Sequence, residues 1–71
     1  MSKIKSTRHA PGSYVVTDGV NEVDVYKVEL EDGEWWIASC FVNHSDPVDT
    51  YREARANAVY ILENWKELAA I

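Results

Sequence analysis

The last third of this 71-residue chain carries the clearest helical pattern in the sequence. Thr50 and Glu53 have the spacing of a capping box, in which a Thr hydroxyl accepts a hydrogen bond from the backbone amide three residues later. After Thr50, apolar residues recur at the spacing of one helix face, namely Tyr51, Ala54, Ala58, Ile61, Leu62, Trp65, Leu68 and Ala69. This pattern predicts a helix over about 51–69 whose single apolar face can cover one side of a sheet.

Three stretches before the helix have the composition of β-strands, with many β-branched and aromatic side chains. They are residues 13–17, 22–31 and 34–42. Asp18-Gly19 and Asp32-Gly33 lie between them, and both are favoured hairpin turn pairs. The predicted fold class is therefore α+β, with a three-stranded antiparallel β-meander followed by one C-terminal α-helix packed on one face.

The N-terminal residues 1–12 lack a strand pattern and end in Pro11-Gly12. We expect them to form a flexible tail. Residues 13–71 are then a single domain, because a chain of this length builds one core layer. One helix covers one face of the sheet, so the other face has no cover from the helix.

The middle strand changes its alternation partway along, which indicates a β-bulge near residues 25–26. Val23 and Val25 share one parity, whereas Tyr26, Val28 and Leu30 share the other. We expect the second set to face the helix. The charged residues between them then face away from it: Lys27, Glu29 and Glu31.

Trp35 and Trp36 are adjacent in the third strand, so their side chains point to opposite faces of the sheet. We expect Trp36 to face the helix, because Ala38 and Cys40 on the same face are small and leave room for large helix side chains. Trp35 then lies with Ile37 on the uncovered face. An exposed aromatic patch with a polar rim is typical of a binding surface or a dimer interface.

The candidate partner-binding residues lie on or around this uncovered face, with one outward-facing tyrosine of the helix as a secondary candidate. They are Trp35, Ile37, Glu29, Glu31, Glu34 and Tyr60. Two alternatives leave the face without a partner: the N-terminal tail folds back over it, or its apolar side chains are simply exposed.

The net charge of −5 is unevenly distributed along the chain. Residues 1–17 carry +3, residues 18–34 carry −6 and residues 35–71 carry −2. An acidic sheet repels phosphate backbones and attracts basic partners. The alternative is that the acidic residues only keep a solvated face soluble.

Catalytic, metal and membrane signals are weak or missing in the sequence. Cys40 and His44 could form half of a zinc site, but His9 is the one remaining Cys or His, and a structural zinc usually needs four ligands. We therefore expect no metal, no cofactor and no enzymatic activity. A single Cys fits a reducing, cytoplasmic setting. The sequence contains no apolar run long enough to span a membrane. We expect no signal peptide, because the basic N-terminal residues are not followed by an apolar segment.

Two stretches together, VYKVELEDGEWWIAS and DTYREARANAVYILENWKEL, resemble the HicB-type antitoxin domain over about residues 25–68. The matching positions are Tyr26, Val28, Asp32-Gly33, Trp36, Ala38, Asp49-Thr50, Glu53-Ala54, Asn57-Ala58, Leu62 and Trp65. The resemblance implies direct binding and neutralisation of a small basic toxin that cleaves RNA. The chain departs from that family by lacking a strand after the helix and by having a strand before the matched region. In style it also resembles small phage-encoded inhibitor proteins.

These features lead to three hypotheses about function. The first is a small acidic, non-enzymatic module that binds, and so inhibits or sequesters, a basic protein that acts on nucleic acid. The second is a nucleic-acid-binding module in which the sheet and the basic N-terminal tail contact phosphates and Trp35 stacks on a base. Its basic residues would be Lys3, Lys5, Arg8 and Lys27. The third is a structural homodimer formed sheet to sheet.

Overall fold

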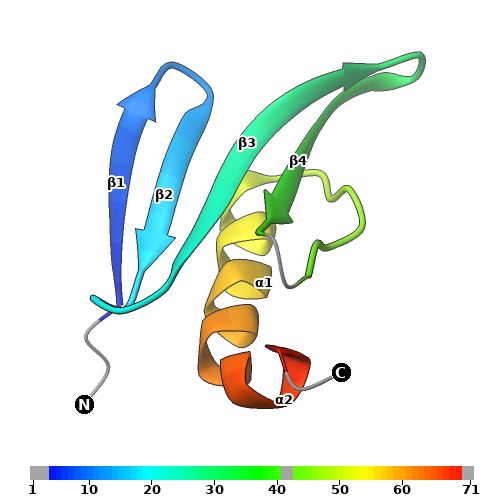
Figure 1. Ribbon diagram of the computed structural model, residues 1–71. Coiled ribbons are helices and arrows are strands. Elements are labelled where there is room, and N and C mark those ends of the chain that lie inside the picture. The colour runs from blue at the N-terminus through cyan, green and yellow to red at the C-terminus, as the bar shows by residue number, and fades with distance from the viewer. Residues whose placement is uncertain (1–3, 41–42, 70–71) are drawn as a thin grey trace.

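The computed structural model describes residues 4–40 and 43–69, which form an antiparallel sheet with a helical layer on one side (Figure 1). The strands are β1 (Lys5–Ala10), β2 (Ser13–Thr17), β3 (Glu22–Leu30) and β4 (Gly33–Ser39), and they pair in that order. The helices α1 (Tyr51–Glu63) and α2 (Trp65–Ala69) follow. The predicted α+β class is confirmed, but the described sheet has four strands and not three.

The additional strand is β1, which occupies residues 5–10 where the sequence predicted a flexible tail. It pairs antiparallel with β2, and residues 11 and 12 make the turn between them. Gly12 has a φ of 76°, a left-handed conformation that glycine adopts without steric cost. Its carbonyl accepts a 2.9 Å hydrogen bond from the amide of Lys27. The described N-terminal residues therefore extend the sheet at its edge and do not fold over its uncovered face.

The expected orientation of the middle strand is wrong. The β2–β3 and β3–β4 ladders both run without a register shift, so β3 has no bulge near residues 25–26. Val23 and Val25 are completely buried beneath α1. Strict alternation then places the remaining β3 side chains: Tyr26, Val28 and Leu30 face away from α1, and Lys27 and Glu29 lie on its side of the sheet.

The core lies between the sheet and the apolar face of α1. Its buried residues are Val16, Val23, Val25, Ala38, Ala54, Ala58, Ile61 and Leu62. Three aromatic rings close one end of it. The ring centroid of Tyr51 lies 4.4 Å from that of Tyr14 and 5.4 Å from that of Trp36. Trp36 and Cys40 pack against this core, which confirms the expected orientation of the third strand.

Helix α1 begins at Tyr51, as predicted, and Thr50 is its N-cap. The Thr50 hydroxyl oxygen accepts a 3.2 Å hydrogen bond from the amide of Glu53. The single predicted helix is divided at Asn64, whose amide group donates to the carbonyl of Tyr60. No helix within residues 4–40 and 43–69 is long and apolar enough to cross a lipid bilayer.

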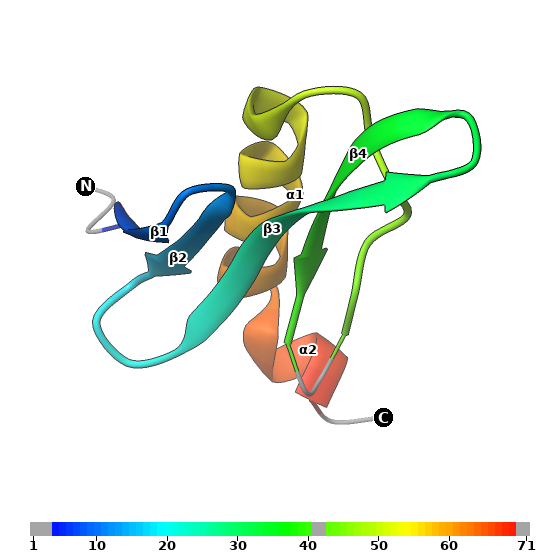
Figure 2. The same cartoon turned by 90° about the horizontal axis from the view of Figure 1, so that it is seen from above.

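The β3–β4 hairpin extends beyond the start of α1 as a projecting arm (Figures 1 and 2). Its tip is the tight turn at Glu31 and Asp32, because Leu30 pairs with Gly33. We call the part of this hairpin beyond the Lys27–Trp36 pair the arm.

Candidate functional site

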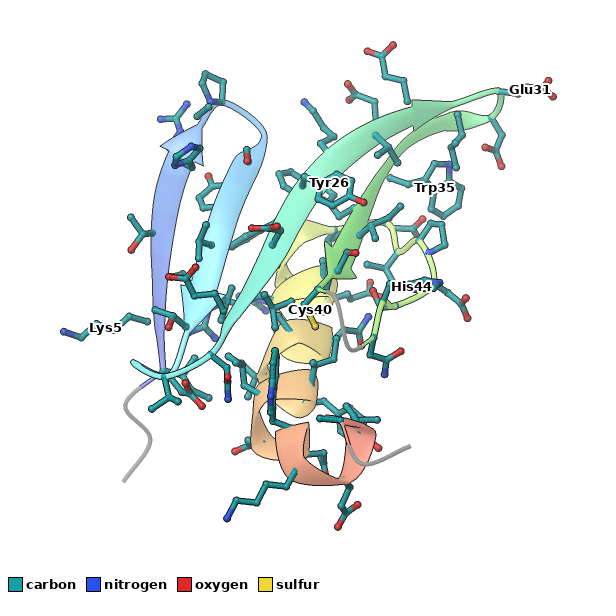
Figure 3. The ribbon with its side chains drawn as sticks, viewed as in Figure 1. Lys5, Tyr26, Glu31, Trp35, Cys40 and His44 are labelled. Atoms are coloured by element: carbon teal, nitrogen blue, oxygen red, sulfur yellow. The ribbon has the colours of Figure 1, made fainter. Side chains whose placement is uncertain are left out.

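The face of the sheet opposite α1, which we call the open face, carries a continuous apolar patch. The alternation fixes its members, since Val16, Val25 and Ala38 are buried on the α1 side. Within the ladder, Val28 is directly opposite Trp35 and Tyr26 is directly opposite Ile37. We define the open-face patch as Val15, Tyr26, Val28, Leu30, Trp35 and Ile37. Figure 3 shows Tyr26 and Trp35 on the neighbouring strands β3 and β4.

No described helix or strand covers this patch, because α1 contacts β2, β3 and β4 from the other side and α2 contacts α1. Leu30 is 49% exposed, and the other five members are half-buried by one another and by their neighbours. Trp35 and Trp36 are both half-buried. Apolar surface of this kind remains available for a partner.

Trp35 is held in place by the turn at the tip of the arm. Its indole Nε1 donates a 2.9 Å hydrogen bond to Oδ1 of Asp32. The Val28 side chain lies across from it on β3. Cross-strand pairs of an aromatic with a β-branched residue stabilise a hairpin. The indole is therefore ordered before any partner arrives.

The predicted acidic rim is only partly present. Glu29 and Glu34 are opposite each other on the α1 side of the sheet, where Lys27 Nζ lies 3.5 Å from a Glu34 oxygen. They are therefore separated from Trp35 by the sheet itself. Glu31 lies at the tip of the arm, at the end of the open-face patch (Figure 3).

Three acidic residues that sequence reasoning missed border the patch instead. Glu22 and Asp24 have the same parity as Tyr26 and so lie on the open face of β3. Asp32 lies at the tip of the arm and accepts from Trp35. The sequence carries no local signal for this placement. The structure shows that Val23 and Val25 are buried, and alternation then assigns Glu22 and Asp24 to the opposite face.

The α1 side of the sheet changes from apolar in the body to charged in the arm, whereas the open face carries apolar side chains in both. In the body, the α1 side is apolar. In the arm, the charged residues lie on the α1 side, because α1 does not extend far enough to cover them, and the apolar ones lie on the open face. In the arm, the charged residues on the α1 side are Glu29 and Glu34, and the apolar residues on the open face are Val28, Leu30 and Trp35.

Tyr60, the secondary candidate, is not part of the open face. It lies on α1, is 60% exposed and borders a hollow of about 360 Å³ beside the segment 43–48. His44 and Asp46 line the same hollow. Because α1 covers the face opposite Trp35, the sheet separates Tyr60 from the open-face patch.

The described residues contain no group of three or more His, Cys, Asp or Glu side chains placed to hold a metal ion. Cys40 is a half-buried free thiol at the end of β4, and His44 makes a short bridge to Ser39. Asp18 lies in the turn between β2 and β3. Hydrogen bonds from the amides of Asn21 and Val20 lower the pKa of its carboxyl group, which stabilises a turn.

Comparison with protein-family models, with curated proteins and with solved structures finds no match to this chain. The resemblance to HicB-type antitoxins therefore depends on the sequence motifs alone.

Proposed function

We propose that this chain is a small acidic protein-binding module that inhibits or sequesters a basic partner protein without catalysis. Its mode of action would be that of an antitoxin or of a phage-encoded inhibitor. The observation that supports this most is the open-face patch, which no described element covers. A face of this kind is the usual place for a small domain to bury a partner.

The patch has the composition of an interface centre. Trp35 and Tyr26 are aromatic, and buried aromatic side chains contribute most to binding in many interfaces. Both have a polar end as well as an apolar body. The hydrogen bond from Trp35 to Asp32 reduces the conformational freedom that binding would otherwise remove. A rigid anchor of this kind favours affinity.

The charges around the patch favour a basic partner. Glu22 and Asp24 lie on the open face, and Glu31 and Asp32 lie at the tip of the arm. The whole chain has a net charge of −5. Acidic groups at the rim of an interface increase the rate of encounter with a basic surface and reject acidic partners. A toxin that acts on RNA has such a surface, which is consistent with the HicB resemblance.

The test is affinity capture from the source organism, followed by calorimetry with the captured partner. We expect Trp35→Ala to weaken binding by about 2 kcal/mol or more, as for a hot-spot aromatic, while the domain stays folded. The Trp35→Ala, Glu31→Lys double variant should lose the partner altogether. Tyr60→Ala is the matched control, because it removes an exposed aromatic ring from the other side of the molecule.

Three outcomes would contradict the proposal. If Trp35→Ala leaves the affinity for the partner unchanged and Tyr60→Ala reduces it, the interface lies on α1. Tight binding of nucleic acid that weakens steeply with salt would favour the nucleic-acid hypothesis instead. A dimer that Trp35→Ala dissociates, observed by sedimentation, would favour the sheet-to-sheet homodimer.

A further inference from the structure

The two edges of the sheet differ in how their backbone groups are used. The outer edge of β4 is covered by the segment 43–48. Trp36 and Val48 exchange backbone hydrogen bonds of 2.8 and 2.9 Å, and the amide of Ser45 donates to the carbonyl of Ala38 at 2.7 Å. The outer edge of β1, in contrast, receives no backbone hydrogen bond from another segment within residues 4–40 and 43–69.

A free strand edge presents a row of unpaired N–H and C=O groups to which another strand can add. All six residues of β1 are exposed. Figure 1 shows β1 at the side of the sheet furthest from the β3–β4 arm, without a helix beside its outer edge. The geometry for strand addition is therefore present at this edge.

Positive charge gathers at this edge, although the chain as a whole is acidic. Lys5 is paired with Thr17 and lies on the open-face side, whereas Arg8 is paired with Tyr14 and lies on the α1 side. Arg55 of α1 adds a third cation, because its Nε donates a 2.6 Å hydrogen bond to the hydroxyl oxygen of Ser6.

Within the described residues, no carboxylate forms an ion pair with these three cations. The ion pair found among those residues joins Lys27 to Glu34, at a distance from β1. The carboxylates that give the chain its negative charge lie mainly in residues 18–34. The β1 edge is thus a basic site on an acidic protein.

We propose that the outer edge of β1 binds an extended acidic segment of a partner protein, which adds to the sheet as a fifth strand. Successive side chains of such a segment point to opposite faces. Carboxylates on one face would meet Lys5, and those on the other would meet Arg8 and Arg55. Backbone pairing supplies affinity, and the charges select acidic sequences.

A second copy of this chain is a poor occupant of the edge. β1 contains two cations, Lys5 and Arg8, and no acidic residue. Pairing β1 with itself would place like charges on adjoining strands, which is destabilising. Lysine on an edge strand is a common means of preventing such self-association. This site is independent of the open-face patch, because it lies at a different surface and takes the opposite charge.

The test uses a fluorescent peptide of about nine residues, long enough to form a strand, that repeats Glu-Glu-Thr-Thr and so carries carboxylates on both faces of that strand. The control peptide has the same charge but Pro in place of Thr, which prevents strand pairing. We expect the wild-type chain to bind the first peptide at least about tenfold more tightly than the second, because only the first can use the β1 backbone. Amide chemical shifts in the wild-type chain should change in β1 and β2.

Arg8→Glu and Lys66→Glu make the same change in charge, but only the first lies on β1. Lys66 is exposed on α2. We expect Arg8→Glu to reduce the affinity of the chain for the Glu-Thr peptide by roughly tenfold or more, because a charge-assisted contact is lost. Lys66→Glu loses no such contact and should change this affinity by less than about twofold.

Several results would overturn the proposal. Equal affinity for the two peptides, or equal effects of the two variants, would show attraction by overall charge alone. Shift changes confined to the open-face patch would place the peptide elsewhere. Dimerisation through β1, or stronger binding of a single-stranded oligonucleotide than of the peptide, would assign the edge to another occupant. The amide chemical shifts are measured on the wild-type chain. They therefore locate the bound peptide even if Arg8→Glu fails to fold.

Discussion

The indole of Trp35 is bonded to the carboxylate of Asp32, three residues earlier in the chain and at the turn of the same hairpin. The side chain proposed to anchor a partner is thus fixed by the turn that ends the arm. This arrangement couples the shape of the turn to the position of the aromatic ring.

Asp32→Ala should release the Trp35 indole. We expect a cost in stability of less than about 1 kcal/mol, because the bond is solvent-exposed and an ordinary hydrogen bond contributes about that much. The Trp35 indole N–H resonance should shift and exchange faster with solvent. Asp32→Asn retains an acceptor oxygen, so it should change the stability and the Trp35 indole resonance less than Asp32→Ala does. An indole resonance that is identical in Asp32→Ala and the wild type would show that the bond does not form in solution.

Leu62→Ala should destabilise the domain by roughly 2 to 5 kcal/mol through loss of buried surface and the cavity left behind. Leu62 is 5% exposed and packs in the core beneath the sheet. Urea unfolding followed by circular dichroism measures the change. Tyr60→Ala, two residues earlier at an exposed position, should change stability by about 0.5 kcal/mol or less. Similar midpoints for both variants would mean that α1 does not dock on the sheet as described.

Thr50→Ala should cost about 0.5 to 2 kcal/mol, because the amide of Glu53 loses the hydroxyl oxygen that accepts its hydrogen bond. The hydroxyl also donates to the Glu53 carboxylate at 3.5 Å. Thr50→Ser keeps the hydroxyl and should retain most of the stability. Thermal unfolding compares the three chains, and a Ser variant as unstable as the Ala variant would argue against capping.

Asp18 should contribute a pH-dependent share of stability. Two backbone amides donate to its carboxylate, at 2.9 and 2.7 Å, and they lower its pKa in the folded state. A lowered folded pKa means that the contribution is fully present above the unfolded carboxyl pKa and is lost as pH falls through the folded value. Asp18→Asn should lack this component. Urea unfolding of both chains across the acidic range should show their stabilities converging as pH falls, and parallel curves would contradict this.

The helix and the third strand were predictable from local chemistry. Thr50 and Glu53 define the helix start without help from the rest of the fold. Ala38 and Cys40 have small side chains, which leave space for helix side chains on their face of the strand. This observation correctly predicted that Trp36 packs against the core. Both predictions were correct because they concern residues that are close in the sequence. Helical or strand geometry alone then fixes the relative positions of these residues.

The middle strand could not be oriented from its own sequence. It carries apolar residues on both faces, Val23 and Val25 on one and Tyr26, Val28 and Leu30 on the other. The prediction explained this with a bulge. The actual reason is that β3 is longer than the part that α1 covers, so the two sets serve different surfaces. How far a helix covers a strand depends on tertiary packing. It cannot be inferred from the alternation of polar and apolar residues in the strand.

The strand β1 was missed because five of its six residues are polar and all six are exposed. An edge strand that buries nothing has no hydrophobic pattern to detect. The signal that was available is Pro11-Gly12, since proline followed by glycine favours a tight turn as well as ending a tail. If this pair is taken as a hairpin turn, the sequence predicts a strand before it that pairs with residues 13–17.

The projecting arm has a consequence for how the molecule opens. A two-stranded ribbon without a helix behind it is held mainly by its own ladder and by cross-strand contacts. Its amide protons should therefore exchange with solvent through local opening, at lower free energy than those of Val23 or Val25, whose exchange requires the core to separate. A partner that docks on Trp35 would close this local route. Slower exchange in the arm would then report binding even where the remainder of the domain is unaffected.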